Sequence, residues 1–483
     1  MAKLSPMMEQ YFEIKNKYKY CLLFFRLGDF YEMFYDDALI ASKELELTLT
    51  GKNCGQEERA PMCGVPFHSA DSYIAKLVSK GYKVAICEQI EDPKLAKGIV
   101  KRDVIRVVTP GTVIDNATLD EEKNNYIVSV YADKNGYGMA ICDVTTGEFS
   151  ATEFTGINAK SQLIDECAKF NPSEIISNEG FTSTAEATEI ETRLHIKIGI
   201  SDDWMFEYNT ANIELCRHFS VETMDGFGLK NKIFCICASG CLMKYLKDTQ
   251  KNDLSHITNI KYYSTGEFML LDISSRRNLE LTETLREKNK KGSLLWVLDK
   301  TKTAMGARLM RSYIEQPLID ADKINRRLNA VAELYDEFFT REEIKEILNS
   351  MYDFERITTK IIYQTANGRD LVSLKNSIEN IPLLKNTISN SKSQYLKDLY
   401  NEIDTLEDIY SLIDSAIVDE DTPFSVREGG IIKHGYNNEL DILLKAKENG
   451  SVWLKELEER EREKTGIKNL KVRYNKVFGH YIE

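Results

Sequence analysis

The sequence predicts a multidomain protein in which mixed α/β domains come first and a long-helix scaffold follows. Its 483 residues exceed the limit of roughly 250 to 300 residues beyond which a single hydrophobic core stops growing. A hydrophobic content of 42% and an aromatic content of 10%, with only 9 prolines, fit a well-packed soluble chain rather than a disordered one. The apolar pattern also changes along the chain, from strand-like alternation to helix-like spacing of three and four residues.

Residues 1–112 are predicted to form a small mixed domain of helices and strands. Gly81 is expected to close one of its helices, and Pro110 and Gly111 interrupt the last strand. The polar, acidic and aperiodic segment 113–125 has the composition of a linker. The expected elements are a helix over 6–19, a strand over 21–28, a helix beginning at Asp29, a helix over 70–80, and strands over 83–89 and 104–112.

Residues 126–260 are predicted to form a second α/β domain. The segment begins with alternating strands, and Asn135-Gly136 and Thr146-Gly147 mark the turns of a three-stranded meander. A helix over 157–170 and a strand over 173–177 complete a β-β-β-α-β order. That order resembles the ribonuclease H fold.

Residues 261–440 are predicted to be almost wholly helical, because apolar residues recur at spacings of three and four. A charged helix over 438–464 leads into residues 470–483, which are predicted to form the opening strands of a further β-rich element with Lys471, Arg473 and Lys476 exposed. No turn or cap precedes Glu483, so we expect the sequence to be truncated.

Cysteine usage and hydropathy indicate a cytosolic protein. No apolar run approaches the roughly 20 residues needed to cross a bilayer, and the first residues lack the apolar core of a signal peptide. The ten cysteines lie in apolar strings, so we expect them to be reduced. Cys235, Cys237 and Cys241 could suggest a metal site, but they have no partnering His or second Cys pair. A buried core helix is the favoured interpretation.

A net charge of -13 argues against a protein that coats nucleic acid by bulk attraction, so DNA contacts would need local basic patches. One patch holds Lys94, Lys97, Lys101, Arg102 and Arg106, with a single acid among them. Taken alone, it is better explained as a solvated loop and strand edge.

Phe30-Tyr31-Glu32 is the most informative short string. Alone, it is explained by core packing at a strand-to-helix junction, with Glu32 as a first-turn acid. The strings at 61–68, 85–90 and 108–112 follow it in order, and together they resemble the mismatch-binding domain of the MutS family. The resemblance continues through Ser275–Glu280, Gly292–Asp299, Asp353–Ile357, Arg427–Ile432 and Gly435–Asn437, and covers nearly the whole chain, although over 126–260 it is mainly one of pattern.

The resemblance, which is to the bacterial homodimeric type, implies a function and a domain plan. A mismatch-recognition domain (1–112) and a linker (113–125) would be followed by a ribonuclease H-like connector (126–260), a helical core or lever (261–440) and the start of a clamp (441–483). It implies that Phe30 is a wedge inserted from the minor groove beside a mispaired base, and that Glu32 hydrogen-bonds that base. Further candidate DNA contacts are Met62, which is expected on a loop that could approach the lesion, and Lys97, Arg102, Arg106, Lys471, Arg473 and Lys476.

The chain departs from the full-length family pattern in two respects. The phosphate-binding string G-x-x-x-x-G-K-[S/T] is absent, and Gly51-Lys52 is not a match. We therefore expect no ATPase activity from this chain, whereas ATP and Mg²⁺ are implied for the full-length family. The resemblance also implies a MutL-type partner at the connector, homodimers in full length, no membrane, and a bacterial cytoplasmic, nucleoid-associated location. Gly368 replaces a common Pro, a loop change we expect to be harmless.

Two other functions are alternatives to mismatch recognition. A ribonuclease H-like domain could be a metal-dependent nuclease, which needs several converging carboxylates. Asp143 is the strand acid that fits, but Glu166 and Glu174 are not obviously placed beside it. MutS relatives that lack the mismatch domain act in recombination, and Phe30 and Glu32 argue against them.

Overall fold

The computed structural model describes residues 4–55, 59–91, 98–114, 119–252, 254–467, 469–475 and 479–483. The chain divides into two compact units, one formed by Met1–Ala366 with Leu383–Ile403 and the other by Asn367–Pro382 with Asp404–Glu483. Within the described ranges no helix is both long and apolar enough to cross a membrane.

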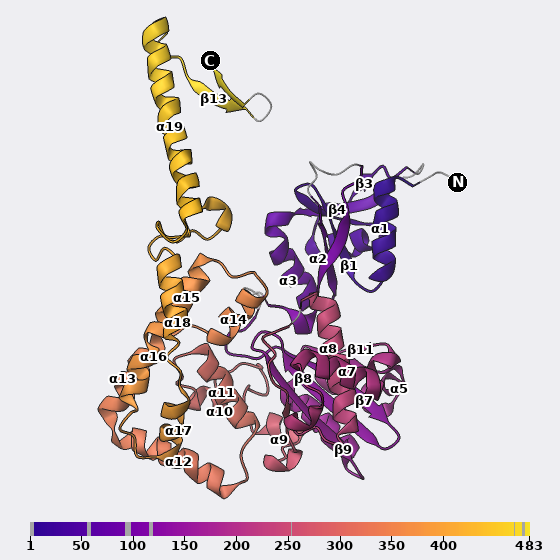
Figure 1. The fold of residues 1–483 in the computed structure, drawn as a ribbon. Coiled ribbons are helices and arrows are strands. Elements are labelled where there is room, and N and C mark those ends of the chain that lie inside the picture. Colours follow the sequence, from indigo (N-terminus) through magenta and orange to yellow (C-terminus); the bar gives the residue numbers. More distant parts are fainter. Residues whose placement is uncertain are drawn as a thin grey trace. The chain divides into compact units, whose positions relative to one another are not determined.

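The first domain is a six-stranded sheet with helices on both faces (Figure 1). The strand order is β3-β4-β2-β1-β5-β6, and only the β1–β5 pair is parallel. Side chains alternate across the strands, so one face packs against α1 and the other against α2 and α3. The elements are β1 (Leu22–Leu27), β2 (Phe30–Phe34), β3 (Thr50–Lys52), β4 (Ala60–Pro66), β5 (Val84–Gln89), β6 (Arg102–Val108), α1 (Pro6–Lys17), α2 (Tyr35–Leu45) and α3 (Ala70–Ser79), with 3-10 turns η1 (Phe67–Ser69) and η2 (Pro110–Thr112).

Two predictions in this domain are wrong. The helix expected from Asp29 begins only at Tyr35, because the preceding five residues form β2 and pair with β1 on one side and β4 on the other. Met62, expected on a loop, lies in β4 between β2 and β3. Prolines and a glycine in this strand are locally unfavourable for a sheet, and strand pairing overrides that preference.

The second domain is another six-stranded sheet, in the order β11-β10-β7-β8-β9-β12. The predicted meander, helix and fourth strand are confirmed as β7, β8, β9, α4 and β10. Helices α7 and α8 pack on one face and α4 to α6 on the other. The elements are β7 (Tyr126–Asp133), β8 (Gly136–Asp143), β9 (Glu148–Thr155), β10 (Glu174–Ser177), β11 (Ile198–Ile200), β12 (Lys261–Tyr262), α4 (Ala159–Phe170), α5 (Glu179–Thr182), α6 (Ala185–Leu194), α7 (Tyr208–Phe219) and α8 (Ile233–Gln250), with 3-10 turns η3 (Asp203–Phe206) and η4 (Met224–Phe227).

Close approach of α8 to this sheet depends on Gly138 in β8. A Cβ at that position would lie 2.0 Å from the carbonyl oxygen of Phe234, so any side chain there would push the helix away. Cys235, Cys237 and Cys241 lie buried in α8, as predicted for a core helix. Burial raises the pKa of the Cys237 and Cys241 thiols to about 12, which keeps them protonated and unreactive.

The remainder is helical, as predicted, up to a terminal hairpin. Several helices begin at a side-chain cap, for example Asp353 before α14 and Asn367 before α15. The predicted final strands are confirmed as the antiparallel pair β13 and β14. The elements are α9 (Ile273–Asn278), α10 (Leu294–Leu298), α11 (Ala304–Glu315), α12 (Ala321–Asp336), α13 (Phe338–Asn349), α14 (Phe354–Ile362), α15 (Gly368–Glu379), α16 (Ile381–Thr387), α17 (Gln394–Glu402), α18 (Glu407–Ala416), α19 (Asn438–Thr465), β13 (Val472–Asn475) and β14 (Gly479–Ile482), with 3-10 turns η5 (Thr265–Glu267) and η6 (Val426–Glu428).

Candidate nucleic-acid interface

A tight hairpin between β1 and β2 exposes Phe30 at one end of the first sheet. Leu27 in β1 pairs with Phe30 in β2, which leaves a two-residue turn at Gly28 and Asp29. Gly28 has φ of 58°, a left-handed conformation that suits the first position of such a turn. The Phe30 side chain is 47% exposed, in contrast to the buried aromatic residues around it.

Glu32 follows Phe30 on the same face of β2. The strand alternates, so Phe30, Glu32 and Phe34 share one face while Tyr31 and Met33 face the opposite core. Phe34 is fully buried beneath α1. The Glu32 carboxylate therefore lies between the covered part of the face and the exposed ring.

An ion pair with Lys52 of β3 holds the Glu32 side chain. The Lys52 Nζ donates to Glu32 Oε2 at 2.5 Å, and the two side chains are 32% and 16% exposed. Gly64 of β4 lies opposite Glu32 in the sheet, and a Cβ there would be 3.5 Å from Glu32 Cγ. The glycine leaves the carboxylate open on that side. Lys52 was not among the predicted site residues.

Arg26 braces the hairpin from the opposite face. Its Nε donates to the Gly28 carbonyl at 2.5 Å, and its guanidinium carbon lies 3.7 Å from the centroid of the Phe67 ring. Its NH1 forms an ion pair with Glu88 at 3.0 Å. The same carboxylate accepts a hydrogen bond from Tyr31, and burial together with that bond raises the pKa of the Tyr31 hydroxyl. These contacts fix the turn that carries Phe30, and sequence reasoning missed them.

Two of the predicted basic contacts have partners inside the protein. Arg102 donates to the Arg26 carbonyl at 2.7 Å, to the Val100 carbonyl at 2.9 Å and to Gln10 at 3.0 Å, and burial lowers its pKa. Arg106 donates to Gln250 at 3.1 Å and to the Thr112 carbonyl at 3.0 Å. Both arginines are therefore committed to internal contacts.

The other candidates are less closely tied to Phe30. Met62 is half-buried on β4, where its register partner in β2 is Phe34. Lys471 and Arg473 belong to the other compact unit, and Arg473 forms an ion pair with Glu483 at 2.7 Å. Lys97 and Lys476 lie outside the described residues. Phe30 and Glu32 thus lie together on β2, whereas Met62 lies on the neighbouring strand, four positions from Pro66, the residue that pairs with Phe30.

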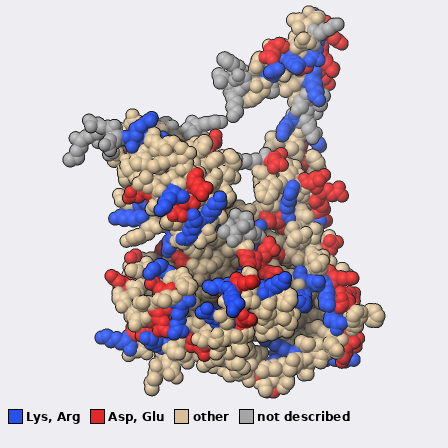
Figure 2. All heavy atoms as spheres, turned by 180° about the vertical axis from the view of Figure 1, so that it is seen from behind, with Lys and Arg blue, Asp and Glu red and all other residues tan. Residues whose placement is uncertain are grey.

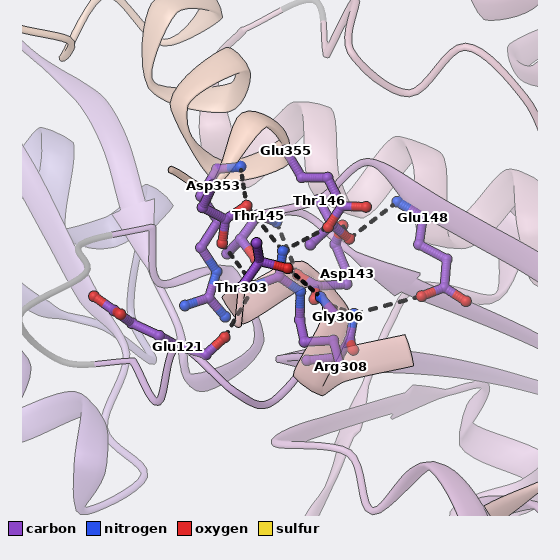
Figure 3. Close-up of polar contacts among 12 residues, drawn as sticks. Glu121, Asp143, Thr145, Thr146, Glu148, Thr303, Gly306, Arg308, Asp353 and Glu355 are labelled. Carbon is purple, nitrogen blue, oxygen red and sulfur yellow. Dashed lines mark hydrogen bonds and ion pairs between the residues drawn. The ribbon is translucent and has the colours of Figure 1, made fainter. Parts of the chain in front are cut away.

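The acids considered for a nuclease each have a separate structural role. Asp143 accepts hydrogen bonds from the Asn124 side chain at 2.8 Å and from the Thr145 hydroxyl at 2.7 Å (Figure 3). Glu166 binds Lys169 and the Tyr263 hydroxyl, and Glu174 binds Lys83 and the Tyr245 hydroxyl. Across the described residues no cluster of three potential metal ligands occurs. The geometry gives no support to the nuclease alternative.

Two buried arginines hold the segment that joins the two sheets. Arg308 NH1 donates to the Glu121 carbonyl at 2.9 Å, and the same guanidinium forms ion pairs with Asp353 and Glu355 (Figure 3). Arg356 NH2 donates to the Lys123 carbonyl at 2.7 Å. The segment is thus fastened to helices α11 and α14, a feature that its linker-like composition does not predict.

Surface charge is mixed rather than uniformly basic. Figure 2 shows Lys and Arg side chains interspersed with Asp and Glu over the face that it draws. This agrees with the net charge of -13. A nucleic-acid contact would therefore depend on local groups such as the hairpin and its neighbours.

Comparisons with known proteins assign the family. MutS domain I matches residues 5–117, MutS domain II matches 125–258 and MutS domain III matches 274–477. The chain belongs to the MutS family. Proteins named DNA mismatch repair protein MutS are similar over all of this chain, with 54% identity in Lachnoclostridium phytofermentans, 57% in Acetivibrio thermocellus and 55% in Ruminiclostridium cellulolyticum. The chain covers 52%, 55% and 55% of these relatives, so it spans about half their length.

The MutS domain matches place the features described above. Phe30, Glu32 and Lys52 lie in the part that matches MutS domain I, and Asp143 lies in the part that matches MutS domain II. Arg308 and Arg356 lie in the part that matches MutS domain III. Residues 118–124 fall between the first two matches, so the arginine contacts connect that intervening segment to the third.

Proposed function

We propose that this chain binds mispaired or unpaired bases in kinked duplex DNA. In this proposal the Phe30 ring enters the base stack as a wedge, and Glu32 accepts a hydrogen bond from the displaced base. The observation that carries the proposal is an exposed aromatic ring on a braced hairpin, with a carboxylate two residues away on the same face. Membership of the MutS family supports the choice of ligand.

The energetics of a wedge favour mismatches without any sequence code. Opening a base step costs a few kcal/mol, whereas stacking a base on an aromatic ring returns about 1 to 3 kcal/mol. On matched DNA these contributions roughly cancel. A mispaired base stacks and pairs poorly, so the deformation costs less and the difference appears as specificity.

Glu32 is proposed to discriminate rather than to attract. A carboxylate brought close to phosphates is repelled and desolvated, which weakens binding to every duplex. An ionised Glu32 can accept a hydrogen from thymine N3–H, but bonding to a purine N7 would require the protonated acid. Matched DNA keeps thymine N3–H in a base pair, so only a mispaired base offsets the repulsion.

Supporting contacts to the duplex are proposed from the remaining candidates. Met62 lies two strand positions from Glu32's neighbour Gly64 and would add apolar contact beside the lesion. Lys97, Lys471, Arg473 and Lys476 are proposed as phosphate contacts. Arg102 and Arg106 are proposed to stabilise the domain instead, because each guanidinium group makes internal hydrogen bonds.

The wider roles rest on the family resemblance. Residues 1–112 would read the lesion, and the connector, 126–260 with its ribonuclease H-like order, would dock a MutL-type partner. The helical lever, 261–440, and the clamp start, 441–483, would carry the signal onward. In the full-length family a homodimer and ATP-driven signalling complete the activity, and we propose the same context for this chain.

A titration of this chain and its Phe30→Ala variant tests the proposal. The probes are a fluorescent duplex with one G·T mismatch and its matched counterpart, and Tyr20→Ala is the control because Tyr20 is a 94% exposed aromatic residue of the same domain. We expect Phe30→Ala to weaken mismatch binding about 10- to 100-fold, in line with the loss of one stacked base, and Tyr20→Ala to change nothing. Equal binding of both duplexes by the unaltered chain, or no binding to either, contradicts the proposal.

A further inference from the structure

Glu32 is held by only one of its two carboxylate oxygens. Lys52 Nζ contacts Oε2, and in the described part of the chain no hydrogen bond reaches Oε1. The carboxylate is partly exposed, and Gly64 opposite it adds no side chain that could cover it. The ion pair thus fixes the direction of the carboxylate and leaves one oxygen available as an acceptor.

Lys52 is itself held in place from two sides. Its backbone belongs to β3, in register with Ala60 of β4, and its Nζ lies 5.7 Å from the centroid of the buried Phe34 ring. An ammonium group near an aromatic face gains a modest electrostatic attraction. The lysine side chain therefore reaches across β4 to Glu32 from a fixed strand instead of from a free loop.

We propose that Lys52 is the positioning residue that sets mismatch discrimination, acting through Glu32. It keeps the carboxylate oriented with Oε1 toward the base, because Oε2 is occupied by the ion pair. This inference rests on the proposed base contact of Glu32. It predicts that Lys52 matters for the ratio of mismatch to match affinity more than for affinity itself.

A double-mutant cycle separates this role from its alternatives. Lys52→Met should lower the mismatch-to-match affinity ratio about threefold, the size expected for a partly exposed ion pair, and Lys52→Arg should retain it. In the Glu32→Gln background, Lys52→Met should leave the ratio unchanged, because the residue through which it acts is gone. The control is Lys80→Met, which removes a lysine paired with Glu44 in the same domain at 2.8 Å, and should alter neither duplex.

Three results of the cycle would overturn the inference. Equal losses on both duplexes, with a shallower salt dependence, would make Lys52 an ordinary phosphate contact. An effect of the same size in the Glu32→Gln background would show that Lys52 acts independently of Glu32. If Glu32→Gln itself leaves the mismatch-to-match affinity ratio unchanged, Glu32 does not contact the base, and the inference about Lys52 fails with it. The Glu32→Gln measurement therefore shows whether the failure belongs to the proposed function or to the role of Lys52.

A second measurement needs no DNA and no Lys52 variant. Reductive methylation of the whole chain, read by mass spectrometry, reports how readily each lysine reacts. We expect Lys52 to react severalfold faster in Glu32→Gln than in the unaltered chain, because the ion pair that occupies its amine is lost, while Lys80 reacts equally in both. Equal Lys52 reactivity in the two proteins would mean that the pair does not form in solution, and would overturn the inference.

Discussion

Arg308→Met should loosen the segment that joins the two sheets. The guanidinium is 4% exposed and makes four contacts: two with Asp353 at 2.7 and 2.9 Å, one with Glu355 at 2.6 Å and one with the Glu121 carbonyl at 2.9 Å. Burial alone would lower the pKa of Arg308, but hydrogen bonds and charge from Asp353 and Glu355 raise it above its usual value. Methionine keeps an apolar stem of similar length and removes every donor.

The size of the effect on local opening follows from the hydrogen bond between Arg308 and the Glu121 carbonyl. A hydrogen bond from a charged donor contributes about 1.5 to 3 kcal/mol, so losing the Arg308 bond to Glu121 should ease local opening by that amount. Each 1.4 kcal/mol is a factor of ten, which predicts about 10- to 100-fold faster opening. Asp353 is also left mostly buried without its cation, which further destabilises this junction.

Hydrogen exchange with mass spectrometry measures this opening. The backbone amide of Asn125 donates to Asp143 at 3.1 Å and is a protected reporter at the end of the segment. The control is Arg326→Met, because Arg326 is 51% exposed in its pair with Asp398, and such pairs contribute little. Exchange over 119–125 that is equally slow in the unaltered chain and in Arg308→Met, or equally accelerated by both variants, would refute the reasoning.

Two further predictions concern carboxylates. Glu32→Gln should bind matched DNA as tightly or more tightly, because a charge that repels phosphates is gone, and should lose preference for the mismatch; an unchanged affinity ratio in an anisotropy titration would contradict this. Burial, opposed by Arg311 and Arg276, raises the pKa of Glu315 from 4.5 to about 7, so its protonated form is favoured in the folded state. The stability associated with Glu315 should be present below about pH 4.5 and be lost as the pH rises to about 7. Relative to the unaltered chain, Glu315→Gln should gain in urea midpoint over that interval, and a constant difference across it would show the assignment to be wrong.

Short-range sequence patterns predicted the turns and helices that are determined by residues close together in the chain. Asn135-Gly136 predicted the β7–β8 hairpin, and the structure confirms the hairpin with its two-residue turn at Lys134 and Asn135 and with Gly136 paired to Asp133. Apolar spacing of three and four predicted the helical region, and the apolar surroundings of Cys235 predicted a buried helix. In each case the residues that decide the structure lie within a few positions of one another.

Pairing between segments that are distant in the sequence explains the features that were not predicted. Phe30–Phe34 was expected to begin a helix, but β1 and β4 complete its hydrogen bonds and make it a strand. Lys52 lies 20 residues from Glu32, and Arg26 lies 62 residues from Glu88. No short-range pattern connects such pairs. Lys52 ends the three-residue strand β3, and a lysine at that position does not by itself specify a partner.

The central claim is that the Phe30 ring enters the base stack beside a mispair. The most direct measurement places 2-aminopurine next to a G·T mismatch and follows its emission, which increases when the base is unstacked. The account predicts that the unaltered chain raises this emission on mismatched DNA and leaves it low on the matched duplex, and that Phe30→Ala abolishes the increase even at concentrations that saturate binding. Equal emission with Phe30 and with alanine, on DNA that is fully bound, would contradict it.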